Sequence, residues 1–313
     1  MKTFIKHFIN SISVCIDLKR RKKGNYFFLI NVLFIRFFYA FPWIRNLRKP
    51  LIKKDFIEKK LFNKKISTNN VLQNMILKGH NSNFKLKKSH LEILKKDIKF
   101  KKTTFAFKGN KKNIEKFSNS LKPDDNLNHI TSKSKKFEIS HVGLEVDLNK
   151  AKKIKQFACS KFFIKIAKSY FNTSNFTISG QCYISNPFKI NEQEKKDNAQ
   201  YFHYDLEFKK FFKVFIYLNE VSKYGGPHVF VENSHNKKIY EHILAQRIDE
   251  KQVKNNYKKN SIKKFYGPEG HIILEDTFGL HKGEVPTINT RSMLILIYGI
   301  NQGIKDYNFF TKP

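Results

Sequence analysis

The sequence has few cysteines. It contains three, Cys15, Cys159 and Cys182, which lie far apart, and it has no Cys-x-x-Cys pair. The odd number and the wide spacing exclude a disulfide framework, which needs paired thiols. Because free thiols persist in reducing compartments, we expect a cytoplasmic protein.

Acidic residues and arginine are also scarce. The chain has 26 Asp and Glu against 61 Lys and Arg, and its formal net charge is +35. Only seven of the basic residues are Arg, whereas nucleic-acid binders usually combine Arg or aromatic residues in a recognisable module. Lysine is instead spread over the chain, together with much Asn, Ile and Phe, as in a biased background composition. The charge permits an anionic partner such as a membrane surface, and it does not favour nucleic acid.

A long, clean apolar run is absent as well. Residues 26–44 are apolar but are interrupted by Asn31, Arg36 and Pro42, and they follow a basic stretch at residues 19–23. A membrane-spanning helix needs about 20 apolar residues, and a central Arg costs about 2.5–3.5 kcal/mol of insertion free energy. No small-residue cleavage site follows, so a signal peptide is not indicated. The run predicts a buried or interfacial helix, with a membrane anchor as the alternative.

The composition divides the chain into three regions. Residues 1–50 form a basic and apolar N-terminal segment, and residues 51–136 are rich in Lys, Asn and Ser with short helical periodicities. Within the second region, residues 118–136 resemble a linker or an exposed loop. The chemistry is expected in the third region, residues 137–313.

The third region predicts a mainly β fold with flanking helices. An amphipathic helix is predicted over residues 151–171, because apolar residues recur there every four positions. Strand-like runs follow, separated by Gly, Pro and Asn, at residues 176–184, 199–220 (two strands), 227–232, 270–276 and 290–300. A succession of this kind is typical of a sandwich or a jelly roll.

One strand-like run carries an imidazole and a carboxylate. His203 and Asp205 are two residues apart, so both side chains point to the same face of a strand. Two His and one carboxylate form the facial ligand set of non-haem Fe(II) oxygenases, and His281, at the end of a later strand-like run, supplies the third group. The His-x-Asp pair alone is weak evidence, because a satisfied polar pair at a strand end has the same pattern.

An arginine follows the distal histidine. Arg291 stands ten residues after His281 and opens the last strand-like run. If residues 283–289 form the turn of a hairpin, Arg291 returns almost opposite Leu280, and its guanidinium reaches the cavity of His281. A guanidinium held there is suited to bidentate binding of a carboxylate, such as that of 2-oxoglutarate.

In this order, the motifs resemble the phytanoyl-CoA dioxygenase family of Fe(II)/2-oxoglutarate-dependent oxygenases. The resemblance covers roughly residues 150–300. The matching elements are His203-Tyr204-Asp205, the strand KVFIYLNEV (213–221), the Gly-Pro turn and Ser-His of GGPHVFVENSH (225–235), His281 and Arg291.

The resemblance implies a double-stranded β-helix, also called a jelly roll, with iron near one mouth. His203, Asp205 and His281 would hold Fe(II), and Arg291 would bind the distal carboxylate of the cosubstrate 2-oxoglutarate. Dioxygen would then oxidise a small or conjugated metabolite, usually by hydroxylation, with release of succinate and CO₂. The carboxylate of Asp205 argues against halogenation, because related halogenases have a small residue at this position.

Three more residues are assigned to the cosubstrate side. Gln181 and Tyr183 share the polar face of their strand, which either faces solvent or lines the cavity. Lys213 lies at the start of the family-like strand, where a cosubstrate contact and a purely structural role are both open. One departure is Gly283, because family members often have a hydroxyl residue two positions after the distal His, and Thr290 or Ser292 would have to replace it.

The competing function is a basic binding protein, associated with membrane or nucleic acid, on an inactive oxygenase fold. The net charge and the apolar N-terminal run motivate it, and the complete ligand set argues against it. Substrate specificity is expected in the loops at residues 185–199, 206–211 and 233–268, the last of which would serve as a lid.

Overall fold

The computed structural model describes residues 38–99, 105–123, 125–189, 200–206, 209–244 and 247–300, and the single residues Ile9, Ile12, Ile30 and Phe34. Cys15 and most of the predicted apolar helix at residues 26–44 lie outside this part. Within it, no helix is both long enough and apolar enough to cross a lipid bilayer.

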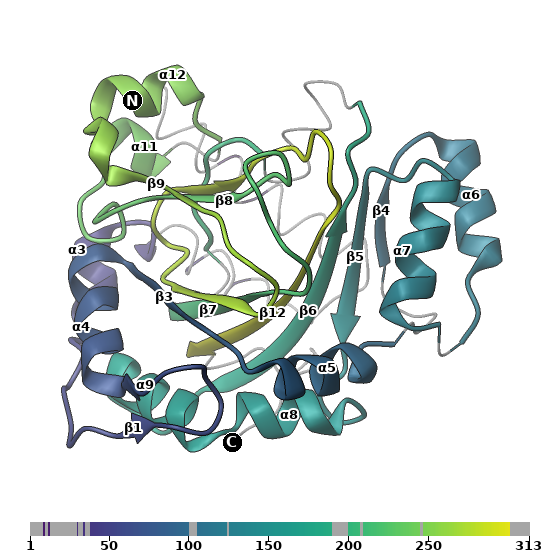
Figure 1. Ribbon diagram of the computed structural model, residues 1–313. Helices are drawn as coiled ribbons and strands as arrows, with labels where there is room; N and C mark the ends of the chain where they lie inside the picture. Colours follow the sequence, from purple (N-terminus) through teal and green to yellow (C-terminus); the bar gives the residue numbers. More distant parts are fainter. Residues whose placement is uncertain are drawn as a thin grey trace.

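Two antiparallel sheets form the centre of the molecule (Figure 1). The large sheet has, in spatial order, β3 (His80–Lys85), β10 (His271–Glu275), β7 (Lys210–Tyr217), β12 (Arg291–Ile300), β6 (Thr177–Ser185), β5 (His141–Val146) and β4 (Phe105–Lys108). The small sheet has the order β11 (His281–Gly283), β8 (His228–Val231) and β9 (Ile262–Phe265). From β7 onward the chain passes back and forth between the sheets: β7 is in the large sheet, β8 and β9 are in the small one, β10 is in the large one, β11 in the small one and β12 in the large one. This is the path of a double-stranded β-helix, and the predicted fold class is confirmed.

Each face of the large sheet packs against a different partner, because side chains alternate along a strand. On β7, Val214 and Ile216 belong to the cluster on the outer face, with the buried residues of the helices α4 (Thr68–Lys78), α5 (Lys88–Asp97), α8 (Lys152–Ala158) and α9 (Lys161–Phe171). Phe215 and Tyr217 point the other way and pack with Val229 and Phe230 of the small sheet. A polar side chain at an inner position of the large sheet therefore enters the space between the two sheets.

The remaining elements lie at the margins. They are α3 (Pro42–Arg45), β1 (Ile57–Glu58), β2 (Ile66–Ser67), α6 (Lys111–Ser120), α7 (Leu127–Lys136), α11 (Tyr240–Leu244), α12 (Glu250–Asn256) and a 3₁₀ turn, η1 (Lys259–Ser261). The last three stand in the loop that was predicted as a lid, residues 233–268.

Three local predictions were wrong. Residues 118–136 are not one loop, because residues 127–136 form α7. Asn126 caps this helix by accepting a hydrogen bond from the His129 N–H (3.0 Å), and the side chain of Ile130 in the helix is buried. The predicted helix at 151–171 is two helices, since Ser160 takes an extended backbone conformation between α8 and α9. In the first half of 199–220, the described residues 200–206 form two isolated bridges, at Phe202 and His203, rather than a strand.

The large sheet crosses the predicted boundary between residues 51–136 and 137–313. β3 from the first region pairs with β10, and β4 pairs with β5 at the opposite edge. The division therefore does not mark a break in the sheet.

An ion pair ties the N-terminal segment to the same sheet. Arg45 in α3 is buried, and its Nη2 lies 2.6 Å from Oδ1 of Asp276, which directly follows β10. The Tyr170 hydroxyl of α9 donates to the other carboxylate oxygen of Asp276. The guanidinium also lies over the rings of Phe211 and Phe278, which shield the pair from water.

Candidate metal centre

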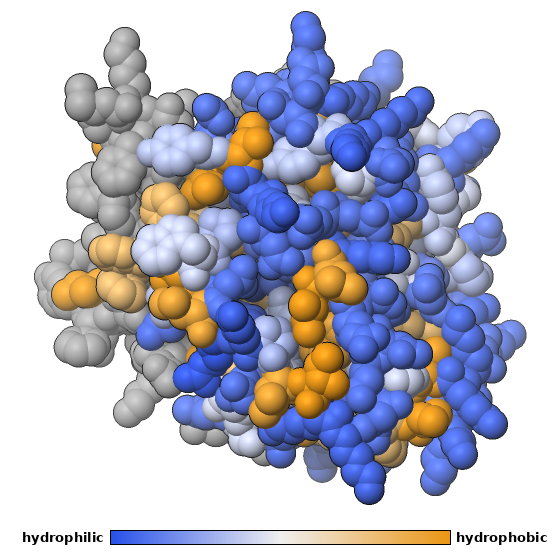
Figure 2. Space-filling view, turned by 90° about the vertical axis from the view of Figure 1, so that its left-hand side faces the viewer, coloured by the Kyte–Doolittle hydropathy of each residue, from blue (hydrophilic) through white to orange (hydrophobic). Residues whose placement is uncertain are grey.

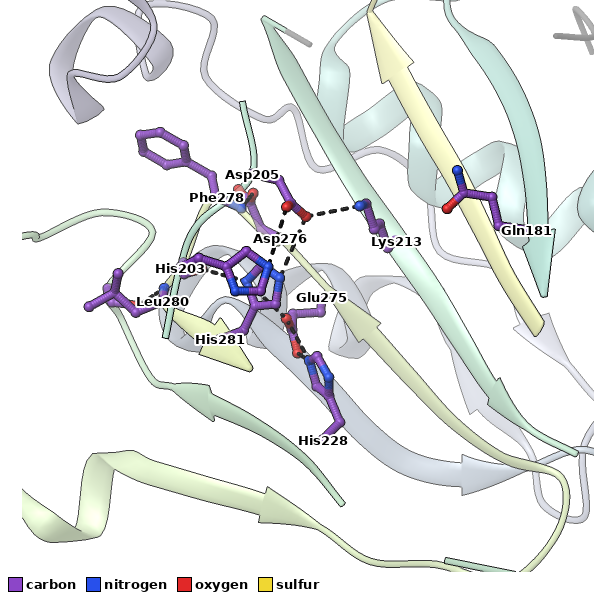
Figure 3. Close-up of polar contacts among 12 residues, drawn as sticks. Gln181, His203, Asp205, Lys213, His228, Glu275, Asp276, Phe278, Leu280 and His281 are labelled. Carbon is purple, nitrogen blue, oxygen red and sulfur yellow. Dashed lines mark hydrogen bonds and ion pairs between the residues drawn. The ribbon is translucent and has the colours of Figure 1, made fainter. Parts of the chain in front are cut away.

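The three predicted ligands meet at one place between the sheets (Figure 3). His203 and His281 form an antiparallel bridge in which each backbone N–H donates to the carbonyl of the other residue, at 3.0 and 2.8 Å. The Asp205 N–H donates to the Thr277 carbonyl at 2.9 Å, so the segment around Asp205 runs beside the loop that leads into β11. One potential ligand atom from each residue lies within 4.8 Å of the other two.

Both imidazoles are held with Nε2 toward the common centre. Nδ1 of His203 lies 2.9 Å from the Tyr201 carbonyl, and Nδ1 of His281 lies 2.9 Å from the Gly279 carbonyl. A carbonyl only accepts, so each Nδ1 carries the proton and each Nε2 has a free lone pair. The two Nε2 atoms lie 3.8 and 3.5 Å from the oxygens of Asp205. Metal-ligating histidines are commonly oriented in this way.

The protonation states also suit a metal. Burial lowers the pKa of His281 to about 4, and burial together with His281 lowers the pKa of His203 well below its ordinary value. Both rings are therefore neutral at neutral pH, which is the ligating form. Burial opposes ionisation of Asp205, but Lys213 and the two rings outweigh it and hold the carboxyl pKa well below its usual range.

Lys213 contacts one of the ligands. It lies on the inner side of β7, and its Nζ is 2.9 Å from Oδ2 of Asp205. The ion pair fixes the orientation of the carboxylate and favours ligation through one oxygen. The structure therefore places Lys213 beside the ligand set.

A second carboxyl next to the ligands was not predicted. Glu275 at the end of β10 is fully buried, its oxygens lie 3.0 and 2.9 Å from Nε2 of His228, and one of them lies 4.0 Å from Nδ1 of His281. Burial and the nearby Asp205 raise the pKa of Glu275 well above its usual value, and burial lowers the pKa of His228 to about 3. The pair is therefore neutral, with the Glu275 O–H donating to Nε2. In the sequence, the signal for Glu275 is a carboxyl group that directly follows the apolar residues 272–274, at a position that faces the small sheet.

Arg291 is the first residue of β12, and its side chain is on the inner face of the sheet and only 5% exposed. Its Nη1 donates to the Gly226 carbonyl, and its Nη2 lies 3.4 Å from the Ser185 hydroxyl. Its Nε is buried and has no hydrogen-bond partner among the residues that the structure describes. An orphaned buried donor costs about 1–3 kcal/mol, so this edge of the guanidinium fits a bound acceptor such as a carboxylate.

The route that brings Arg291 near His281 differs from the predicted hairpin. β11 and β12 belong to different sheets, so residues 284–290 cross from one sheet to the other. The guanidinium nevertheless lies against Gly283, where a Cβ atom would stand 2.8 Å from Nη2. Glycine at this position thus makes room for Arg291, and the neighbouring hydroxyl comes from Ser185. Thr290, considered as a substitute, donates to Asn186 instead (2.9 Å).

Gln181 and Tyr183 lie on the inner face of the large sheet. They pair in register with Ile295 and Met293, whose side chains belong to the inner cluster. The Tyr183 hydroxyl donates to Gln181 at 3.1 Å. Figure 3 shows Gln181 beyond Lys213 as seen from the three ligands, so Gln181 lies between the sheets but away from the centre itself.

No protein-family model and no curated protein matches the sequence. Similar solved structures include AviO1 from Streptomyces viridochromogenes Tue57, with 9% identity and a TM-score of 0.46 over 74% of this chain and 94% of that one. The epimerase SnoN, solved with Fe3+, alpha-ketoglutarate and nogalamycin RO, shows 10% identity and a TM-score of 0.46 over 74% and 83%. EctD from S. alaskensis, solved with 2-oxoglutarate and 5-hydroxyectoine, shows 12% identity and a TM-score of 0.45 over 80% and 82%. With such low identities and TM-scores, the function has to be inferred from this chain's own residues.

Proposed function

We propose that this protein is an Fe(II)/2-oxoglutarate-dependent dioxygenase of the phytanoyl-CoA dioxygenase type, which hydroxylates a small or conjugated metabolite. The convergence of His203, Asp205 and His281, with both Nε2 lone pairs directed at one point, carries the proposal. Arg291, with its orphaned buried Nε, supports a carboxylate-bearing cosubstrate in the same enclosure.

Each residue of the site has a separate role in the proposed reaction. His203, Asp205 and His281 would hold the metal, because two imidazoles and one carboxylate are the ligand set of non-haem Fe(II) sites. Bound Fe(II) with 2-oxoglutarate supplies the oxidising chemistry, with release of succinate and CO₂. Arg291 binds the distal carboxylate and so sets the position of the cosubstrate. Lys213 keeps Asp205 ionised and oriented.

The surroundings limit the charge in the site. Glu275 and His228 form a neutral pair, so they pack beside His281 without adding net charge to the site. The apolar side chains of Phe215, Phe230 and Ile273 belong to the cluster around them and exclude water from the space between the sheets. Exclusion of water strengthens the electrostatic hold on both metal and cosubstrate.

Anaerobic titration with Fe(II) and then 2-oxoglutarate tests the proposal. We expect the visible charge-transfer band of the chelate in the native protein, and its loss in His203→Ala and His281→Ala. His129→Ala, which removes an exposed histidine far along the sequence from the site, is the matched control. Circular dichroism shows that each variant is folded. A native protein that binds no Fe(II) and gives no band would overturn the proposal.

The competing function, a binding protein on an inactive oxygenase fold, predicts an incomplete ligand set. The complete set in this structure favours catalysis.

A further inference from the structure

A cavity lies outside the sheets, between α3, the end of α9 and the start of β7. Its volume is about 710 Å³. Five cationic residues line it, namely Arg45, Arg48, Lys49, Lys209 and Lys210, and no Asp or Glu is among its described lining residues. Such a cavity attracts an anion.

Two of the cations are built into the wall. Lys210 is 4% exposed, its Nζ donates to the Arg48 carbonyl at 2.6 Å, and it lies 4.8 Å from the centre of the Tyr170 ring. Burial, helped by Arg45, lowers the pKa of Lys210 to about 7, so a bound anion would favour its charged form. Arg45 is paired with Asp276, whereas Arg48, Lys49, Lys209 and Lys210 have no ion-pair partner in the described part of the chain.

Exposed apolar side chains lie in the same stretch of chain as the cationic lining, and one of them, Leu47, lines the cavity itself. Trp43 is 68% exposed and Leu47 is 76% exposed, and Leu51 and Ile52 are each about half exposed. Figure 2 looks at this side of the molecule and shows apolar patches set among hydrophilic side chains. In the segment 47–54, with the sequence LRKPLIKK, the three exposed aliphatic residues alternate with four cations. The Leu51 N–H donates to the Ser169 carbonyl of α9, which holds the segment on the body of the protein.

We propose that this face docks on an anionic lipid surface. The cavity takes a lipid phosphate, and Trp43, Leu47, Leu51 and Ile52 enter the boundary between headgroups and acyl chains. Basic residues interleaved with Trp and Leu are the composition of interfacial segments. A free phosphate would leave the four apolar side chains without a partner, and aliphatic side chains do not stack on nucleic-acid bases. The inference is independent of the iron chemistry.

Trp43 reports the docking directly, because it is the only tryptophan of the chain. We expect a blue shift of its fluorescence when the full-length protein meets vesicles of phosphatidylglycerol and phosphatidylcholine. Pure phosphatidylcholine vesicles should give no shift, and 0.5 M NaCl should reverse it.

Three double variants locate the surface. Arg48→Glu with Lys49→Glu should weaken vesicle binding at least tenfold. Lys150→Glu with Lys152→Glu makes the same charge change at exposed positions before and in α8, and it should change binding less than twofold. Leu51→Gln with Ile52→Gln should weaken binding while the salt dependence is retained.

Three outcomes would overturn the inference. Absence of a shift with anionic vesicles means no lipid docking. An equal loss in both charge-reversal variants means that the overall charge, rather than this face, binds the membrane. A shift with inorganic phosphate or with duplex DNA, and none with vesicles, assigns the cavity to a soluble anion or to nucleic acid. Unchanged melting curves confirm that each variant is folded.

Discussion

Replacing Gly283 with alanine should weaken 2-oxoglutarate binding and leave metal binding intact. The new Cβ would stand 2.8 Å from Nη2 of Arg291, 3.3 Å from Nη1 and 3.4 Å from Cζ, and the first distance is shorter than real Cβ contacts. The guanidinium is buried and is held by the Gly226 carbonyl and near the Ser185 hydroxyl, so it cannot withdraw without losing these contacts. It must therefore turn away from its binding position.

The magnitude follows from the contact that is lost. A hydrogen bond to a charged group contributes about 1.5–3 kcal/mol. The dissociation constant for 2-oxoglutarate should therefore rise roughly tenfold to a hundredfold, since about 1.4 kcal/mol corresponds to a factor of ten. Anaerobic titration of the Fe(II) protein with 2-oxoglutarate, followed at the charge-transfer band, measures it. The Fe(II) affinity should stay within about twofold, because the orienting bond of His281 is made to Gly279.

A double-mutant cycle with Arg291→Ala separates this effect from general damage. If Gly283→Ala acts through the guanidinium, it should have no further effect once Arg291 has been replaced by alanine. An equal loss of 2-oxoglutarate affinity in both backgrounds would refute the reasoning, and so would unchanged affinity in the single variant.

Three further predictions concern charge, pH and a helix cap. Lys213→Met removes the cation that opposes the effect of burial on Asp205, so the carboxyl pKa should rise and Fe(II) binding should be lost at a higher pH than in the native protein; an unchanged midpoint in a pH titration contradicts this. Burial lowers the pKa of His235 from an ordinary 6.5 to about 4, so its contribution is complete above pH 6.5 and is lost as the pH falls toward 4. His235→Gln should therefore reduce the acid-induced loss of stability by about 2 kcal/mol at pH 5, measured by urea unfolding, and an equal loss in both proteins argues against it. Asn126→Ala should lower the free energy of unfolding by about 1 kcal/mol through loss of the α7 cap, whereas Asn128→Ala, at an exposed position two residues later in the first turn of α7, should not.

Two parts of the candidate site could be predicted from local signals in the sequence, and the resemblance in motif order joined them, since His281 lies 76 residues after Asp205. His203 and Asp205 are adjacent on one face of the chain, and the spacing from His281 to Arg291 is short. The neutral pair of His228 and Glu275 joins residues 47 positions apart, and no local pattern links them. Their contact exists only because β8 and β10 lie in facing sheets.

The absence of a local signal for distant contacts also explains the wrong predictions of secondary structure. Residues 118–136 are polar and contain a Pro, so their composition favours a loop, whereas tertiary burial of Leu127 and Ile130 stabilises a helix. The edge strands β3 and β4 are polar or short, and only their pairing with β10 and β5 makes them strands. The prediction of a hairpin between His281 and Arg291 was wrong, because the number of residues between two strands does not distinguish a turn within one sheet from a connection between two sheets.

The contact between Arg45 and Asp276 has a consequence for any attempt to divide this protein. Asp276, the ion-pair partner of Arg45, directly precedes Thr277 in the chain. The Thr277 carbonyl accepts the hydrogen bond from the backbone N–H of Asp205, which is one of the three candidate ligands. A chain shortened to residues 137–313 would leave a buried carboxylate with no cation, at a cost of about 3–5 kcal/mol, and would also strip β3 from β10. The part of the chain that carries the candidate metal centre therefore depends on the segment that we assign to the lipid surface, and removing that segment would also destabilise the centre.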